Sequence, residues 1–198
     1  MRVKKIKQKD YLVSVIMNCH NGEKYLKQSL KSVINQSYKR WELIFYNNLS
    51  TDNSKKIVRR YNNDKRIKYF ESKKFLNLYD ARNQAIKKSK GDYVCFLDTD
   101  DFWKKNKLKI QIDYMEKNNQ VFSHTSYEII NEENKLISSN TAKLKISFDE
   151  LVNSCDIGLS TVILNTKFMK KNNYFFPKIK TKEDFVLWLK IGKKIKFM

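Results

Sequence analysis

The chain is poor in residues that break regular structure, with four glycines and one proline among 198 residues. This composition excludes a collagen-like, linker-rich or turn-dense all-β chain. No apolar run approaches the roughly 18–20 residues that a membrane-spanning helix needs. The basic segment at residues 1–9 precedes too short an apolar run for a secretory signal. With 41% hydrophobic residues, the sequence predicts one globular domain over residues 1–198.

Cysteine and histidine are also scarce. Cys19, Cys95 and Cys155 lie far apart, and no Cys or His spacing is typical of a zinc site. Cys95 lies inside an apolar segment and is expected to pack as a small core residue. His124 stands alone and is expected to be structural. We therefore expect a protein of the reducing cytoplasm.

Acidic residues are few relative to basic ones: 21 Asp and Glu face 41 Lys and Arg, which gives a net charge of +20. Such an excess favours a polyanionic partner, which is a nucleic acid, an anionic membrane surface or a phosphorylated substrate. Compositional bias is an equal alternative, since the basic residues are spread along a chain that also holds 20 asparagines. No RNA-recognition motif occurs, so we expect no specific nucleic-acid binding but some attraction to anionic lipid.

Against this basic background, three carboxylates crowd residues 98–101 (DTDD), directly after the apolar segment 93–97. Carboxylates this close repel one another unless a cation lies among them. Hard divalent cations take oxygen ligands, and they often bind through one or two carboxylates plus substrate phosphates. The cluster therefore predicts a metal site for a phosphorylated ligand. The alternative is a solvated acidic turn.

Short apolar segments alternate with segments of helical periodicity through the first half of the chain. This alternation predicts a mostly parallel sheet flanked by helices on both sides, the Rossmann type of α/β fold. Ligands of such sheets bind at the carboxyl ends of the strands, where Asn18, residues 47–48 and residues 98–101 all fall. The expected strands are 11–17, 41–46, 67–70 and 93–97, and the expected helices are 23–36, 53–61 and 78–88.

The second half predicts a more mixed structure with a small antiparallel portion. The pattern indicates a helix over 104–117, antiparallel β structure over 121–130 and 135–138, a helix over 148–153, a strand over 160–165 and a helix over 182–194. We expect one domain made of two halves, 11–118 and 119–198.

Several short segments occur together in one order along residues 11–118. They are 14–16 (SVI), 21–26 (NGEKYL), 32–38 (SVINQSY), 41–44 (WELI), 50–54 (STDNS), 81–83 (ARN), 91–93 (GDY) and 96–101 (FLDTDD). In this order they resemble the family 2 glycosyltransferases, and 182–189 (KEDFVLWL) is similar to that family's acidic pair and Leu-Trp-Leu helix.

The resemblance implies a GT-A fold and an inverting transfer from a nucleotide diphosphate sugar, with a UDP-sugar expected. It implies Mn²⁺ or Mg²⁺ as cofactor and a saccharide or lipid-linked acceptor in bacterial surface polysaccharide synthesis, at the inner face of the plasma membrane. Residues 11–118 would then bind the nucleotide sugar, and residues 119–198 would face the acceptor.

Site roles follow from the resemblance and from the chemistry. The DXD motif would be residues 98–100, with Asp100 on the metal, helped by Asp98 or Asp101, and with Asp98 and Thr99 near the donor. Arg82 would lie over the base or diphosphate. Inversion needs a base that takes the acceptor proton; Asp184 is the first candidate and Glu183 the second. The alternative for that pair is an acidic helix start that interacts with the helix dipole.

The sequence departs from the family pattern in two donor-side loops. The usual Pro-Thr-Tyr-Asn reads Asn18-Cys19-His20-Asn21, so that His20 replaces a base-stacking tyrosine, or is a plain loop residue. The usual acidic pair after the second strand reads Asn47-Asn48, which can accept a hydrogen bond but carries no charge. Both changes weaken the prediction that the nucleotide of the donor is a uridine nucleotide. We still expect residues 18–21, Glu23, Asn47 and Asn48 to bind the nucleotide sugar.

Two alternatives to an active transferase stay open. The family normally continues beyond the acidic-pair helix, so the chain is expected to have a shortened acceptor side. It would then be an inactive or truncated domain that binds only a nucleotide or a partner. A metal-dependent nucleotidyltransferase is less favoured, because Asn21-Gly22 does not form a glycine-rich phosphate loop.

Overall fold

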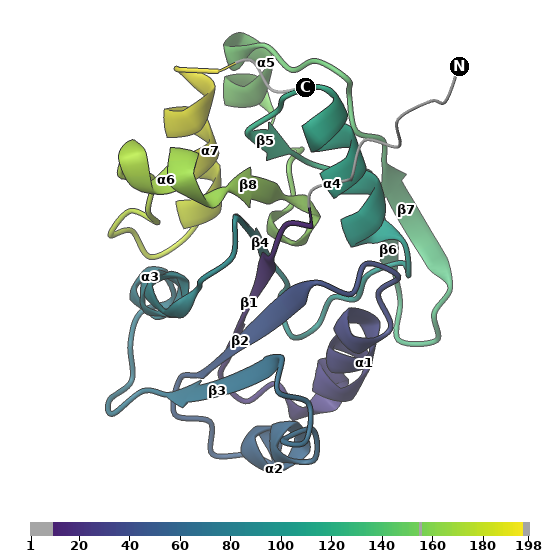
Figure 1. Ribbon diagram of the computed structural model, residues 1–198, viewed down its shortest axis with the longest axis vertical. Helices are drawn as coiled ribbons and strands as arrows, with labels where there is room; N and C mark the ends of the chain where they lie inside the picture. The colour runs from purple at the N-terminus through teal and green to yellow at the C-terminus, as the bar shows by residue number, and fades with distance from the viewer. Residues whose placement is uncertain (1–9, 155, 196–198) are drawn as a thin grey trace, which may run out of the picture.

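The computed structural model describes residues 10–154 and 156–195, which form a six-stranded sheet between two layers of helices (Figure 1). The strand order is β3-β2-β1-β4-β8-β5, and the first four of these pair in parallel. β8 runs antiparallel to both β4 and β5. This arrangement confirms the predicted mostly parallel sheet. The strands are β1 (Val13–Cys19), β2 (Trp41–Asn47), β3 (Ile67–Glu71), β4 (Tyr93–Phe96), β5 (Phe122–Ser123) and β8 (Ile163–Asn165).

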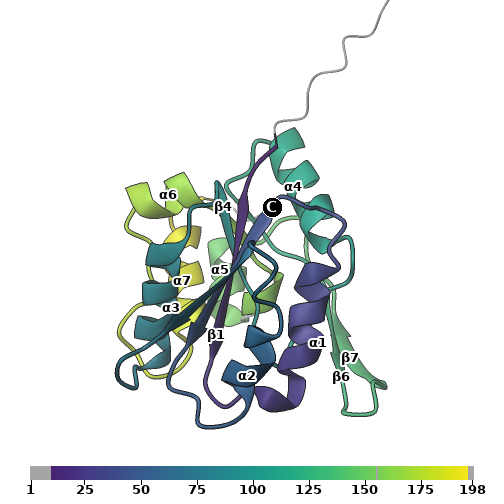
Figure 2. The same cartoon turned by 60° about the horizontal axis from the view of Figure 1, so that its bottom comes forward.

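Helices cover both faces of the sheet, so its central strands are buried on both sides. In β1, Val15 and Met17 face one core and Ile16 faces the other, because successive strand side chains point to opposite faces. This is why β1 is a nearly continuous apolar run. One layer holds α1 (Glu23–Ile34), α2 (Ser54–Arg59) and α4 (Lys107–Lys117), and the other holds α3 (Leu78–Lys88), α5 (Phe148–Asn153), α6 (Thr166–Lys171) and α7 (Glu183–Gly192) (Figure 2).

The second half differs from the prediction in three places. The antiparallel β structure expected over 121–130 and 135–138 is present but divided: β6 (Tyr127–Ile130) pairs with β7 (Leu136–Asn140) in a separate hairpin, whereas β5 joins the main sheet. The strand expected over 160–165 begins instead with a 3₁₀ turn, η1 (Leu159–Thr161). The six-residue helix α6 was missed; the Asn165 side chain caps it by accepting the Phe168 N–H.

The first-half elements were predicted to within a few residues, because their patterns are local. In α1, Leu26, Leu30 and Val33 lie on one buried face at helical spacing. Within the part of the chain that the structure describes, no helix has both the length and the apolar character to cross a bilayer.

A candidate active site at the carboxyl edge of the sheet

The acidic turn, residues 98–101 after β4, is held from both sides. Ser29 of α1 places its Oγ 2.7 Å from the Thr99 carbonyl oxygen and 2.5 Å from that of Asp101. On the other side the Asp98 N–H donates to Ser160 Oγ, which in turn lies 2.5 Å from Asp101 Oδ2. Sequence analysis missed Ser29 and Ser160, since no local pattern connects either serine with the turn.

The three carboxylates of the acidic turn do not converge. Asp98 Oδ1 accepts from Arg82 Nη2 at 3.0 Å, and Asp101 is hydrogen-bonded to Ser160. Asp100 is exposed and has no hydrogen bond or ion pair with the described residues. Among residues 10–154 and 156–195, no three His, Cys, Asp or Glu side chains are grouped so that they could hold a metal ion. The predicted set of three carboxylate ligands is therefore not preformed.

Burial dominates the electrostatics of this turn. It raises the pKa of the Asp98 carboxyl, with the Arg82 guanidinium acting against it and the charges of Asp100 and Asp184 adding to it. Burial likewise raises the pKa of Asp101, opposed by the Ser160 hydrogen bond. A cation beside these oxygens would favour their charged forms. The donor set of oxygens, with Asp100 unengaged, fits a hard divalent cation that also binds substrate phosphates.

Arg82 links the acidic turn to α7. Its side chain, on α3, is only 7% exposed. Nη1 lies 2.5 Å from Glu183 Oε1, and the guanidinium also lies 5.4 Å from the centre of the Phe176 ring. The Glu183 carboxylate is itself 5% exposed. The structure thus places Arg82 beneath the site as a link between two acidic groups.

Asp184 is arranged differently from its neighbour Glu183. Its side chain is half-buried, and Oδ1 accepts the Phe185 N–H at 2.8 Å, with no ion pair to the described residues. Its charge raises the pKa of Asp98, so the two carboxylates share one local field. The preceding residue, Lys182, has a left-handed backbone (φ 57°) that turns the chain into α7. Of the predicted acidic pair, Asp184 is the member without a cationic partner among residues 10–154 and 156–195.

The loops after β1 and β2 are fastened to each other by side chains. Asn21 Oδ1 accepts the Thr51 N–H at 2.8 Å, and Glu23 Oε2 accepts the Asn53 N–H at 2.6 Å. In return, Asp52 Oδ2 accepts the Glu23 N–H. The side chains of Asn21 and Glu23, both predicted to bind the nucleotide sugar, therefore hold this loop pair in place.

Asn47 and Asn48 are buried, and both side-chain amides are engaged. Asn48 exchanges two hydrogen bonds with the backbone of Leu76, at 2.9 and 3.0 Å, as a paired strand residue would. Asn47 donates to the Tyr69 hydroxyl and to Glu71, and its oxygen accepts the Ser50 N–H. The two asparagines thus shape the walls of the predicted nucleotide site, and their amides point into the protein.

The remaining predicted donor residues line the end of β1. Asn18 Nδ2 is buried without a hydrogen-bond partner in the described chain, and Cys19 is buried with Sγ 3.7 Å from Ser50 Oγ. His20 is exposed: Nδ1 lies 2.9 Å from the Asn48 carbonyl oxygen, and the ring meets Phe75 edge-on at 4.8 Å. Phe75 is 60% exposed, and sequence analysis did not single it out, although an aromatic residue directly after two lysines is a usable signal.

Gly22 is required for the close approach of α1 to the acidic turn. An added Cβ would lie 2.8 Å from Thr99 Oγ1 and 3.1 Å from Cys19 Sγ. Gly22→Ala should lower stability by about 1–3 kcal/mol, because Thr99 and the turn must move to remove the overlap. Thermal unfolding measures the effect. Gly158→Ala is the matched control, since its nearest contact would be an ordinary 3.6 Å. Equal melting temperatures for the two variants would contradict this packing argument.

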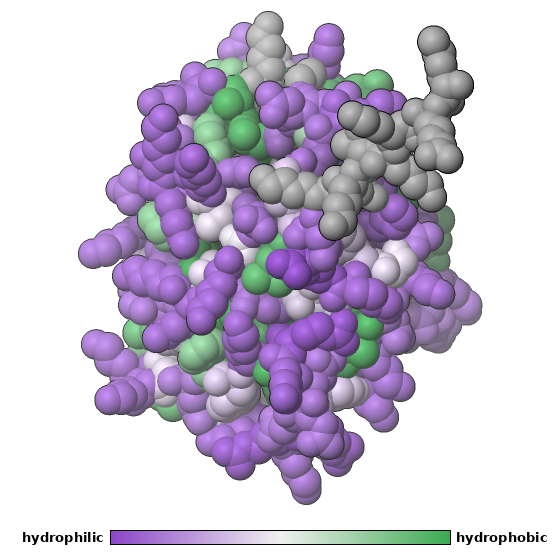
Figure 3. Space-filling view, viewed as in Figure 1, coloured by the Kyte–Doolittle hydropathy of each residue, from purple (hydrophilic) through white to green (hydrophobic). Residues whose placement is uncertain are grey.

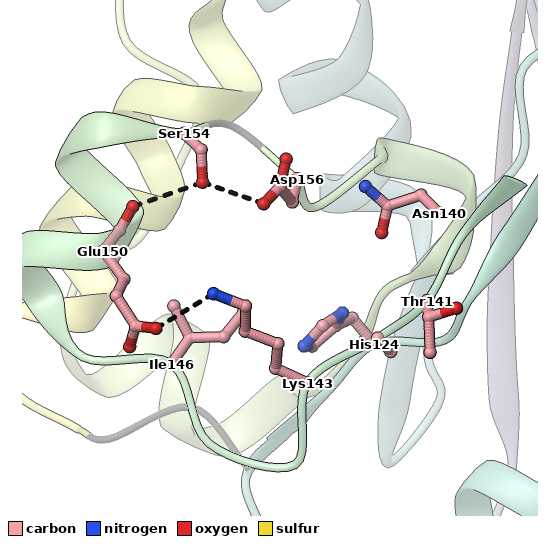
Figure 4. A pocket seen from close by; sticks show the side chains of 9 residues that line it. His124, Asn140, Thr141, Lys143, Ile146, Glu150, Ser154 and Asp156 are labelled. Atoms are coloured by element: carbon pink, nitrogen blue, oxygen red, sulfur yellow. Dashed lines mark hydrogen bonds and ion pairs between the residues drawn. The ribbon is translucent and has the colours of Figure 1, made fainter.

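A separate cavity lies away from the acidic turn, between α5, the end of β7 and His124 (Figure 4). It leaves about 10 Å³ for the centres of water molecules, which is room for one water. Both His124 ring nitrogens are buried without a partner among the described residues, and burial lowers the His124 pKa. A single water would satisfy a nitrogen of this neutral ring, which agrees with the structural role predicted for His124.

Comparison with known proteins agrees with this fold. The sequence profile described as Glycosyl transferase family 2 matches residues 14–175. The Escherichia coli protein WfgD, named UDP-Glc:alpha-D-GlcNAc-diphosphoundecaprenol beta-1,3-glucosyltransferase, is 40% identical over 184 residues, which are 93% of this chain and 71% of WfgD. TuaG of Bacillus subtilis, a putative teichuronic acid biosynthesis glycosyltransferase, is 32% identical over 92% of this chain and 73% of its own length.

A solved structure gives the same result for the architecture. The Staphylococcus aureus TarS fragment 1–349 in complex with UDP-GlcNAc superposes with a TM-score of 0.78 and 25% identity. The match covers 94% of this chain and 55% of the TarS fragment, so this chain spans little more than half of that fragment. The likeness confirms the GT-A-type fold that the sequence resemblance implied.

Proposed function

The chain belongs to glycosyl transferase family 2, and on this premise we propose that it transfers a sugar from a UDP-sugar to a lipid-linked saccharide in surface polysaccharide synthesis. One observation carries the proposal: Arg82 brings the acidic turn and the start of α7 together, with Asp100 and Asp184 left unpaired among the described residues. The names of WfgD and TarS support UDP as the nucleotide of the donor.

The donor would lie along the carboxyl ends of β1 and β4. The exposed rings of His20 and Phe75 offer an apolar surface for the base, since aromatic faces stack on aromatic faces. Asp98 and Thr99 would face the ribose side, and Asp100, with the donor diphosphate, would hold Mn²⁺ or Mg²⁺. When bound, that cation offsets the negative charge of the leaving diphosphate.

The acceptor would approach from the side of α7. Asp184 would take the proton of the acceptor hydroxyl while the hydroxyl oxygen forms a bond to the anomeric carbon of the donor sugar. The bond from that carbon to the diphosphate oxygen breaks at the same time, UDP leaves, and the anomeric configuration inverts. We do not propose Glu183 as the base, because its carboxylate is buried against Arg82.

The acceptor class is proposed from the relatives. The name of WfgD specifies a sugar on diphosphoundecaprenol, and that of TuaG specifies teichuronic acid synthesis. We propose the same class here, a saccharide on a lipid diphosphate carrier, used at the inner face of the plasma membrane.

A thermal-shift screen tests the donor site. UDP, GDP, CDP and dTDP are each added with Mn²⁺, Mg²⁺ or EDTA. We expect UDP with metal to stabilise the protein by about 2.7 kcal/mol at 100 times its dissociation constant. Asp100→Ala should lose the metal-dependent part of that shift, and Asp149→Ala, an exposed aspartate on α5, should keep it. An equal shift in Asp100→Ala would remove Asp100 from the metal site.

Turnover separates an active enzyme from a binding domain. Release of UDP from UDP-glucose or UDP-GlcNAc, with a lipid-diphosphate saccharide present, would support the transferase. A UDP-induced shift without any turnover would favour the inactive or truncated alternative. No shift with any of the four nucleotides would contradict the donor site itself.

A further inference from the structure

Positive charge is dense in the last part of the described chain. Residues 166–195 carry nine lysines and two acidic residues, a net charge of +7 in 30 residues. Residues 10–165 carry 26 basic and 19 acidic residues, which is also +7 but over 156 residues. Residues 55–74, within that part, also carry nine basic and two acidic residues, but three of the nine, Lys55, Arg66 and Lys68, make ion pairs.

The lysines of residues 166–195 are also free of carboxylate partners. In residues 10–165, ten basic residues make ion pairs, among them Lys24, Lys55 and Arg66. None of the nine lysines in 166–195 makes an ion pair with a described residue, and all nine are exposed. The two acidic residues of the segment are Glu183, which is paired with the buried Arg82, and Asp184 at the candidate site.

The charged surface has a defined place in the fold. α6 and α7 belong to the helix layer that packs on the same face of the sheet as α3 and α5, opposite α1, α2 and α4. Figure 1 places α6 and α7 side by side at one edge of the molecule, and Figure 3 shows hydrophilic side chains projecting along that edge. Lys178 and Lys180 lie on the connection that leads into α7 and its Asp184. The cationic surface is therefore continuous in sequence with the proposed acceptor side.

We propose that this surface, the exposed lysines of residues 166–194 (called the lysine face), docks the protein on an anionic lipid bilayer. Charge complementarity carries the inference: unpaired lysines on one layer attract lipid phosphates, and each basic residue near such a surface adds to the attraction. The biological role of this docking rests on the proposed function: the base at the start of α7 would meet an acceptor that is anchored in the same bilayer.

Vesicle co-sedimentation of the full chain tests the proposal. The vesicles are phosphatidylcholine alone or with 30 mol% phosphatidylglycerol, at low and at physiological salt. We expect binding to the anionic vesicles only, weakened by salt. The variant in which six lysines of the lysine face become glutamine (Lys167, Lys170, Lys171, Lys178, Lys180 and Lys190) should lose roughly 100-fold or more in partition coefficient.

A matched variant separates this surface from net charge. It changes six exposed lysines on or beside the opposite helix layer to glutamine: Lys27, Lys31, Lys56, Lys65, Lys105 and Lys117. Both variants lose the same charge. Equal loss of vesicle binding in the two would therefore show an effect of net charge alone and would overturn the lysine face as the docking surface. Wild-type binding by the first variant would overturn it too, as would equal binding to neutral vesicles.

The UDP thermal shift, measured on the same three proteins, keeps the two proposals distinct. A UDP shift without anionic-vesicle binding overturns the docking surface alone. Vesicle binding lost only in the first variant, with no UDP shift in the wild type, supports the docking surface and contradicts the donor site.

Discussion

Replacing Arg82 with methionine should destabilise the protein by roughly 3–5 kcal/mol, because a buried carboxylate loses its partner. Arg82 Nη1 lies 2.5 Å from Glu183 Oε1, and both side chains are at most 7% exposed. The substitution also removes the ion pair of Asp98. Burial already raises the pKa of Asp98, and Arg82 lowers it in the wild type. The same change should therefore loosen the acidic turn and weaken UDP binding in the presence of metal.

Equilibrium unfolding in urea measures the first effect. Arg59→Met, an exposed arginine on α2, is the control and should change stability by less than about 0.5 kcal/mol. The double variant Arg82→Met with Glu183→Gln should recover part of the loss, because the buried charge is gone while the amide keeps the shape. A loss below about 1 kcal/mol in Arg82→Met would contradict the view that this pair holds α7 against the acidic turn.

Asp184→Asn should lower kcat by about 10²–10⁴-fold, because the amide cannot accept the proton of the acceptor hydroxyl. UDP binding and the melting temperature should change little, since Asp184 is half-buried and makes its hydrogen bond with the adjacent Phe185 N–H, which an amide oxygen can also accept. Steady-state transfer from a UDP-sugar, together with a UDP titration, separates the catalytic effect from donor binding.

Asp149→Asn is the matched control for Asp184→Asn. Asp149 is the second residue of α5, as Asp184 is of α7, so both substitutions remove one negative charge from the first turn of a helix. Only the α7 variant should lose turnover. Full turnover by Asp184→Asn would exclude it as the base, and a loss of stability as large as that of Arg82→Met would give it a structural role instead.

Local patterns in the sequence predicted the donor half of the fold closely. A strand that is buried on both faces is mostly apolar, as β1 and β2 are. The helical spacing on α1 and the bounds of α3 were also predictable, because a helix depends on residues that are only three or four positions apart. The position of the acidic turn at a strand end also followed, because parallel strands align their carboxyl ends.

The short elements of the second half were less predictable. β5 has two residues and β8 has three, so neither carries a period that could be read from the sequence. β5 pairs with β8, and β8 also pairs with β4, through hydrogen bonds between residues that are far apart in the chain. The sequence pattern therefore did not show that β5 and β6, both within residues 121–130, belong to different sheets.

By itself, the sequence determined the fold class, the family and the position of the acidic turn, because these depend on residues that are neighbours in the chain. The sequence ranked Asp184 before Glu183 as the base, but only the tertiary structure showed that Glu183 is buried against Arg82 and that the Asn47 and Asn48 amides lie inside the protein. The contact between Arg82 and Glu183 joins residues 101 positions apart. Which of two adjacent carboxylates is buried against an arginine depends on how α3 and α7 pack, and packing on that scale leaves no local pattern in the sequence.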